Sequence, residues 1–329
     1  MKTKIIIVCG GPSSEHDVSL MSTDSILEHI DRDKYDLSLL YITRDKKVTL
    51  LSAGNFSPIP KNATYLSFDE GVEKYLKSSD LVFLSALHGE FGEDGTIQKI
   101  LEENHIPYTG SSSEISKLVM NKEKTAEKLK DIFDLSFPNN IATSQFNNLS
   151  DLSFPLFCKP NNLGSSVGAK IVHSAEELAT YVKEFEEKYP HTTLLIQEYI
   201  KGLEISVGCL EKKSGEFVSL PPIEIIPQHS EYFDYDSKYI AGESLEITPP
   251  THMSKKLSDK LSDLAVEIHK TLGCKLYSRS DFIIKDEKIY FLETNTLPGM
   301  TANSLLPKEA AAIGMNFTQL LDFLISNSL

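Results

Sequence analysis

Short apolar runs alternate with amphipathic segments along the first 111 residues. In chain order, the pattern predicts a strand, a helix, two further strands and a helix at residues 4–11, 19–30, 35–43, 80–89 and 96–106. This alternation is typical of a mainly parallel sheet with helices on its faces, and such sheets bind ligands near the carboxyl ends of their strands. We therefore predict an α/β domain over residues 1–111.

The pattern changes after this domain. Residues 111–129, SSSEISKLVMNKEKTAEKL, predict one long Lys-rich helix. Ser174 followed by Glu177 is a capping-box motif, and it marks the start of another helix in SAEELATYVKEFEEK. Apolar runs that precede and follow these helices predict strands, so residues 112–200 are expected to form a smaller α+β domain.

A third section, residues 201–329, has longer predicted strands. One helix in it carries an apolar stripe, which we interpret as core, and ends at a glycine: Leu257, Leu261, Leu264, Ile268, Leu272 and Gly273. The polar and aromatic segment 228–248 has no clear period, so we expect a long loop that is either disordered or a working lid. Near the end, residues 279–295 predict a hairpin of two apolar strands.

Composition and charge exclude several classes of protein. The 329 residues suffice for two or three domains, and no apolar run approaches the ~20 residues of a membrane span. The opening run IIIVC ends at two glycines, which favours a buried strand over a signal peptide. A net charge of −14 argues against nucleic acid as a partner. The four cysteines form no C-x-x-C pair, which fits a reducing cytoplasm better than a disulfide or zinc framework.

The hairpin carries four polar residues at its outer ends. Side chains alternate along a strand, so Arg279 shares a face with Asp281, and Glu293 shares one with Asn295. A turn centred on Glu287 would put Asp281 opposite Glu293 and gather all four groups on one surface. Two carboxylates and an amide oxygen suit Mg²⁺. The alternative is a solvated face with a structural Arg–carboxylate pair.

A second candidate site follows a predicted strand in CKPNNLGSSVGAK (158–170). Small residues such as Gly164 and Ser166 let backbone N–H groups approach phosphate oxygens, and Lys159 supplies a cation. The segment is not a Walker loop, and by itself it is compatible with a simple hairpin turn. Lys122 is a second candidate cation for the same phosphates.

Taken together, these segments resemble D-alanine–D-alanine ligases, a family of the ATP-grasp superfamily. The resemblance covers essentially the whole chain, and its motifs run in this order: GGPSSEHDVSL (10–20), HGEFGEDGTIQ (88–98), YTGSS (108–112), MNK (120–122), KPNNLGSSVG (159–168), FDYDSKY (233–239), RSD (279–281) and LETNTLPGMTANSL (292–305). It implies an α/β and α+β ATP-grasp fold, in which an N-terminal parallel-sheet domain precedes central and C-terminal α+β domains that clasp ATP.

The resemblance also implies how ATP is bound. The phosphates would meet two lysines and a closing loop, the γ-phosphate a lid lysine, the adenine a hinge segment, and the ribose a carboxylate. Lys122 and Lys159 match the two lysines, Gly164 and Ser166 the closing loop, and Lys238 the lid lysine. Glu198 and Ile200 match the hinge segment at the adenine, and Glu204 matches the carboxylate at the ribose. Asp281, Glu293 and Asn295 match the ligands of two Mg²⁺ ions, with Mn²⁺ as an alternative.

The substrate residues follow from the same resemblance. Glu15 would bind the ammonium of the first D-alanine within a set that includes Ser165 and Tyr239. His88, with Glu93, is expected near the carboxylate of the first D-alanine. Ser304 and the backbone of Leu305 are expected near the carboxylate of the second D-alanine. Arg279 and the Gly299 N–H would stabilise a tetrahedral oxyanion.

The implied enzyme joins two D-alanines through a D-alanyl phosphate, for peptidoglycan precursor synthesis in the cytoplasm. A ligase for D-serine, and below it D-lactate, is the nearest alternative, and Tyr239 favours D-alanine. A catalytically silent nucleotide-binding module is the alternative from another class. Leu163 and Phe233 depart from common family forms, which bears on loop closure. A homodimer is the family expectation.

Overall fold

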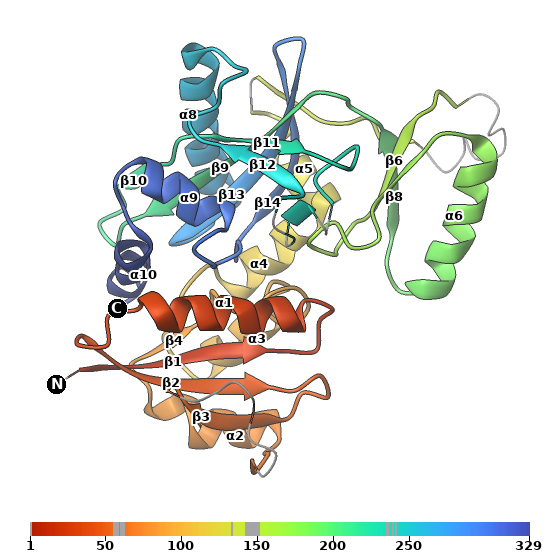
Figure 1. Cartoon of the computed structure of the whole chain (residues 1–329). Helices are drawn as coiled ribbons and strands as arrows, with labels where there is room; N and C mark the ends of the chain where they lie inside the picture. Colours follow the sequence, from red (N-terminus) through yellow and green to blue (C-terminus); the bar gives the residue numbers. More distant parts are fainter. Residues whose placement is uncertain are drawn as a thin grey trace.

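The computed structural model describes residues 2–54, 59, 63–132, 134–141, 152–234, 237–238, 240 and 242–329. Its strands form three sheets, and Figure 1 shows the N-terminal sheet at the bottom of the view, the largest sheet above it, and a small sheet with one long helix at the right.

The N-terminal sheet is mainly parallel, as predicted. Its strand order is β3-β2-β1-β4, in which only β3 runs antiparallel to its neighbour. The elements are β1 (Thr3–Gly10), α1 (His16–His29), β2 (Tyr35–Ile42), β3 (Val48–Ser52), α2 (Phe68–Lys74), the 3-10 helix η1 (Leu76–Ser78), β4 (Leu81–Phe83) and α3 (Thr96–Glu103). The loops after β1 and β4 leave the same edge of this sheet, and they carry Glu15 and His88.

The small sheet has the order β7-β6-β8 and is covered by α6. Its elements are β6 (Leu156–Pro160), β7 (Lys170–Val172), α6 (Ala175–Lys188) and β8 (Leu194–Glu198). The predicted cap is present, because Ser174 Oγ accepts the Glu177 N–H at 3.2 Å. The Glu177 carboxylate accepts the His173 N–H at 2.8 Å, one residue before the cap position.

The largest sheet is built mostly from the last third of the chain. Its strands are β5 (Leu135–Ser136), β9 (Leu203–Glu211), β10 (Phe217–Ser219), β11 (Ile223–Pro227), β12 (Ser244–Ile247), β13 (Tyr277–Lys285) and β14 (Lys288–Asn295). Helix α8 (Lys255–Leu272) packs on this sheet through the predicted apolar stripe and ends at Gly273, whose φ is 82°. Strand β12 lies inside the segment 228–248 that was predicted to be a loop.

The long helix predicted for residues 111–129 is wrong, because two helices occupy this region. Helix α4 (Ser113–Met120) ends before Asn121, and α5 (Lys122–Leu129) begins after it. Asn121 has an extended backbone, and its side chain caps α5 by accepting the Lys124 N–H at 2.9 Å. Both helices pack against β14 of the largest sheet, although residues 112–200 were expected to form one unit. The three-domain division stays a prediction.

The last two helices connect the largest sheet to the N-terminal one. Helix α9 (Leu305–Ala312) packs on β9, and α10 (Phe317–Ser326) packs against α1. Apolar residues of both parts form one continuous core. A buried hydrogen bond of 2.6 Å between the hydroxyls of Ser85, just after β4, and Tyr277, on β13, also joins these two parts. Among the described residues, no helix is long and apolar enough to span a membrane.

Candidate active site

The predicted register of the hairpin is confirmed. Strands β13 and β14 pair antiparallel, with Asp281 opposite Glu293 and Arg279 opposite Asn295. The turn differs from the predicted one, which was centred on Glu287. It is a two-residue turn at Asp286 and Glu287. Both turn residues have positive φ, at 49° and 61°, as in a type I′ hairpin.

A β-bulge makes up the difference. Phe282 pairs with Phe291, whereas Asp281 pairs with Glu293, so Leu292 is an extra residue in β14. The bulge leaves the Leu292 carbonyl as an acceptor for Lys159 Nζ at 3.4 Å. The hairpin therefore sets its polar residues opposite one another and also faces the strand that carries Lys159.

Arg279 and Asp281 form a bidentate pair at the base of the hairpin. Arg279 Nε and Nη2 donate to the two Asp281 oxygens at 3.0 and 2.9 Å, and Ser206 Oγ on β9 donates to Asp281 Oδ1 at 2.7 Å. The Arg–carboxylate pair considered from the sequence is therefore present. Ser280 and Thr294 alternate to the other side, where their hydroxyls share a hydrogen bond of 2.8 Å.

Glu293 is the counter-ion of a group of lysines. Lys122 Nζ lies 3.2 Å from Glu293 Oε2 and donates to the Leu163 carbonyl at 2.8 Å. Burial alone would raise the pKa of Glu293, but Lys122, Lys238 and Lys159 lower it to about 2. Burial lowers the pKa of Lys159 to about 8, against the effect of Glu293. Several lysines thus surround one carboxylate, and such an excess of positive charge can attract an anion.

The loop between β6 and β7 reaches both neighbouring parts of the chain. Ser165 Oγ donates to Glu15 Oε1 in the loop after β1, and Ser166 Oγ donates to the Phe233 carbonyl at 2.9 Å. Both serines have left-handed backbones, with φ of 50° and 57°, which costs about 1 kcal/mol for each non-glycine residue. A Cβ on Gly164 would lie 3.4 Å from Glu93 Oε2, so this loop closes directly over the N-terminal carboxylates.

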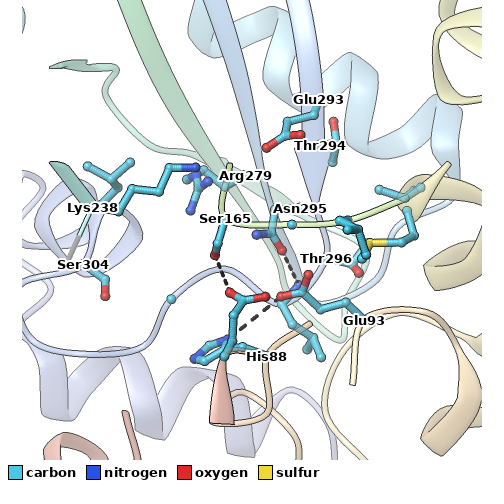
Figure 2. A pocket seen from close by; sticks show the side chains of 18 of the residues that line it. His88, Glu93, Ser165, Lys238, Arg279, Glu293, Thr294, Asn295, Thr296 and Ser304 are labelled. Atoms are coloured by element: carbon cyan, nitrogen blue, oxygen red, sulfur yellow. Dashed lines mark hydrogen bonds and ion pairs between the residues drawn. The ribbon is translucent and has the colours of Figure 1, made fainter. Parts of the chain in front are cut away.

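The N-terminal part of the chain contributes a buried acid and a buried histidine. His88 Nε2 lies 2.8 Å from Ser22 Oγ, and His88 Nδ1 lies 3.9 Å from Glu93 Oε1. Burial lowers the pKa of His88 and raises the pKa of Glu93 well above its usual range, to which Glu15 adds. The histidine is therefore neutral at neutral pH, and the carboxylate that accepts a hydrogen bond from Ser165 is Glu15. Figure 2 shows His88, Glu93, Ser165 and Arg279 around one cavity.

A second, more apolar cavity adjoins the first. Phe157, Tyr199, Phe282 and other apolar side chains line it together with Glu198, Ile200, Glu204, Lys159 and Ser166. Glu198 Oε1 accepts two hydrogen bonds from Asn139, at 3.0 and 2.8 Å. Burial raises the pKa of Glu204 to about 7, although its carboxylate accepts the Phe233 N–H at 3.2 Å.

The start of α9 closes the first cavity. Ser304 precedes the helix, and its hydroxyl accepts the Thr301 N–H at 3.1 Å instead of capping α9. The N–H of Leu305, at the first position of the helix, is one of those that a helix leaves without an internal partner. A Cβ on Gly299 would lie 3.0 Å from Ser304 Oγ. These groups can bind a carboxylate.

The structure brings together every predicted site residue that it describes. The first cavity is lined by Glu15, His88, Glu93, Gly164, Ser165, Arg279, Asn295, Gly299, Ser304 and Leu305, and the second by Lys159, Ser166, Glu198, Ile200, Glu204 and Asp281. Lys122, Lys238 and Glu293 line both cavities. Tyr239 lies outside the described residues. The roles of all these residues stay predictions.

Comparison with known proteins assigns the family. The model "D-ala D-ala ligase N-terminus" matches residues 4–111, and "D-ala D-ala ligase C-terminus" matches residues 126–326. The chain belongs to the D-alanine–D-alanine ligase family. The D-alanine–D-alanine ligases of Leptospira biflexa and Clostridium beijerinckii are 37% and 36% identical, and the alignments cover 100% and 99% of this chain and 99% and 98% of the relatives.

Solved structures of this family share the ATP-grasp fold of the chain. The D-Ala:D-Ser ligase VanG of Enterococcus faecalis superimposes with a TM-score of 0.83 at 29% identity, over all of both chains. The D-alanine–D-alanine ligase of Bacillus anthracis complexed with ATP has a TM-score of 0.76 at 30% identity, over 99% of this chain and 97% of that one. The fold class expected from the sequence is confirmed.

Sequence reasoning missed several polar residues of the site. Ser22 on α1 contacts His88, and Ser206 on β9 contacts Asp281. Glu309 on α9 is fully buried and helps to raise the pKa of Arg279. Each comes from an element brought to the site by long-range packing, and no local motif marks it. The only available signal was the uncommon occurrence of a carboxylate inside an otherwise apolar helix face.

Proposed function

We propose that this protein is an ATP-dependent ligase that joins two D-alanines into D-alanyl-D-alanine through D-alanyl phosphate. The observation that carries this proposal is the pair of adjoining cavities and the residues they share. The apolar cavity suits adenine and ribose, and the polar one suits amino-acid ammonium and carboxylate groups. Lys122, Lys238 and Glu293 lie where a γ-phosphate and a carboxylate would meet.

In the first step, a carboxylate oxygen of one D-alanine attacks the γ-phosphorus, and ADP leaves. Lys122, Lys159 and Lys238 balance the charge that develops on the phosphate oxygens. Glu15, held by Ser165, binds the ammonium group of this D-alanine. His88 and Glu93 support the same site from the N-terminal domain.

In the second step, the amine of another D-alanine attacks the acyl carbon. Arg279 and the Gly299 N–H stabilise the tetrahedral oxyanion, and phosphate leaves as the peptide bond forms. Ser304 and the Leu305 N–H hold the carboxylate of this second D-alanine. Closing the loop at 161–169 over the site excludes water, which would otherwise hydrolyse the acyl phosphate.

The donor set on the hairpin fits Mg²⁺. Asp281 and Glu293 face each other across the strands, and Asn295 adds an amide oxygen, so the ligands are all hard oxygens. No group of three or more His, Cys, Asp or Glu side chains gathers as a metal site in the described part of the chain. The set proposed here has only two such side chains, Asp281 and Glu293, because its third ligand is the amide of Asn295. When bound, Mg²⁺ or Mn²⁺ would neutralise phosphate charge. Asp281, which contacts Arg279, and Glu293, which contacts Lys122, would then have to bind the metal as well.

D-serine is the second candidate for the second substrate, because one close structural match is a D-Ala:D-Ser ligase. The two amino acids differ by one hydroxyl, and pockets often discriminate such pairs only about 100-fold. The test is phosphate release with ATP and Mg²⁺, first with D-alanine alone and then with D-serine or D-lactate added, with the product masses measured. D-alanyl-D-alanine as the main product supports the proposal. A silent nucleotide-binding module would release no phosphate in response to D-alanine.

This activity supplies the dipeptide for peptidoglycan precursors, and we place it in the cytoplasm, where ATP is available. We also propose a homodimer on the basis of family membership. Light scattering of the purified chain tests the dimer independently of the activity.

A further inference from the structure

Glu309 is the most unusual buried group near the site. It lies on α9, one helical turn after Leu305, and is 0% exposed. Within the described ranges, neither of its carboxyl oxygens has a hydrogen-bond partner. A buried carboxyl group without partners is costly, so it requires a specific explanation.

The surroundings of Glu309 point to Arg279. Gly208 on β9 is the cross-strand partner of Arg279, and a Cβ on Gly208 would lie 2.5 Å from Glu309 Oε2. The same Cβ would lie 2.4 Å from Leu306 Cδ1. The glycine therefore lets α9 approach the sheet closely enough for the Glu309 carboxyl to reach the strand position beside the arginine.

The two groups also affect each other electrostatically. Burial raises the pKa of Glu309 well above its usual range, and the Arg279 guanidinium is the main opposing influence. Burial alone would lower the pKa of Arg279, but Asp281 and then Glu309 hold it above its usual value. Arg279 therefore interacts electrostatically with two carboxyl groups, those of Asp281 and Glu309, although only Asp281 is hydrogen-bonded to it.

Asp281 cannot serve Arg279 alone throughout the proposed reaction. Both Asp281 oxygens now accept hydrogen bonds from the guanidinium, and Ser206 adds a third. The proposed function assigns the same carboxylate to Mg²⁺, so the guanidinium has to share or lose this acceptor. An arginine that stabilises an oxyanion needs another anchor to keep its position.

We propose that Glu309 is a positioning residue that anchors Arg279 from α9 when Asp281 binds metal. This inference rests on the proposed function, and it adds a residue that the family match does not assign to the site. It also couples α9, whose first residues would hold the second D-alanine, to the arginine that would stabilise the oxyanion. Glu309 acts through Arg279 and touches no substrate.

The test compares Glu309→Met, which removes the carboxyl at similar length, with Glu309→Gln, which keeps one acceptor oxygen. We expect Glu309→Met to lower kcat at least tenfold, with the KM for ATP within twofold of wild type. Its Tm should be unchanged or up to about 5 °C higher, because an apolar group replaces an unpaired buried carboxyl. Glu309→Gln should keep kcat within threefold. A purely structural role predicts the reverse for Tm, with a loss of stability.

A second background shows whether Glu309 acts through Arg279. In Arg279→Lys, adding Glu309→Met should lower kcat less than twofold, because the group being positioned has already changed. If Glu309→Met does not fold, Glu309→Asp replaces it, since it keeps the carboxyl but shortens its reach, and the same loss of kcat and the same non-additivity are expected. The inference is overturned if kcat stays within twofold of wild type or if the losses multiply fully in the double variant.

Glu224→Gln is the matched control. Glu224 is also 0% exposed, but its carboxylate accepts the N–H groups of Thr251 at 2.9 Å and His252 at 3.2 Å, away from the site. This change should lower Tm and leave kcat within twofold. Failure of the proposed function has a different outcome, because the wild type itself would then release no phosphate with D-alanine.

Discussion

Replacing Glu293 by Gln tests whether this carboxylate holds together the lysines of the proposed phosphate site. The substitution keeps the size of the side chain and removes its charge. Lys122, Lys159 and Lys238 would then face one another without their common counter-ion. We expect the protein without nucleotide or metal to lose stability, because breaking a buried ion pair leaves charge uncompensated.

The magnitude follows from the pKa of Glu293. Its fall from the ordinary value of 4.5 to about 2 corresponds to about 3 kcal/mol of stability, at about 1.4 kcal/mol for each tenfold change in proton affinity. The folded-state pKa is depressed, so this stability is fully present above about pH 4.5 and is lost as the pH falls toward 2. A quarter of the side chain is exposed, and solvent screening reduces the expected loss to about 2 kcal/mol.

The assay is thermal unfolding at pH 7 with EDTA. Glu293→Gln should lower Tm by a few degrees, whereas Glu187→Gln, on the exposed face of α6, should stay within about 1 °C of wild type. Inorganic tripolyphosphate should then raise the Tm of Glu293→Gln more than that of wild type, because the anion replaces the missing charge. Unchanged stability in Glu293→Gln, or an equal tripolyphosphate effect in both proteins, would refute this reasoning.

Three further predictions concern neighbouring parts of the site. Ser165→Ala removes the hydrogen bond to Glu15, so the KM for D-alanine should rise about tenfold with the KM for ATP unchanged; equal rises in both, measured by steady-state kinetics, would contradict the assignment. Lys159 has a pKa of about 8, so it loses its charge above that pH, and kcat/KM for ATP should fall from there upward; Lys159→Arg should abolish this fall, and a pH profile shared by both proteins would exclude Lys159 as its source. Gly208→Ala should lower the free energy of unfolding by about 1–3 kcal/mol in urea, because the new methyl group overlaps Leu306; full stability would show that α9 can move away.

The hairpin shows how far the sequence could be used to predict the site. Side chains alternate strictly along a strand, so the even spacing of Arg279 and Asp281, and of Glu293 and Asn295, predicted one polar face. The extra residue Leu292 was not predicted. Bulges depend on local twist and on neighbours such as Lys159, which are distant in sequence.

Other features depended on tertiary contacts that no local pattern records. The break at Asn121 was overlooked because the apolar and Lys-rich pattern continues through it, although asparagine is a strong cap residue. Ser206 faces Asp281 only because β9 and β13 are neighbours in the sheet. A loop was predicted at 164–168 and is present between β6 and β7, but its contacts with Glu15 and Phe233 come from two distant segments.

The central claim is that the reaction proceeds through D-alanyl phosphate, and an oxygen isotope tests this intermediate most directly. D-alanine labelled with ¹⁸O in its carboxyl group is supplied with ATP and Mg²⁺, and the inorganic phosphate is analysed by mass spectrometry. If the carboxylate attacks the γ-phosphorus and phosphate later leaves the acyl carbon, each phosphate carries one ¹⁸O and ADP forms in equal amount. Phosphate without the label, or AMP with pyrophosphate, would contradict the account.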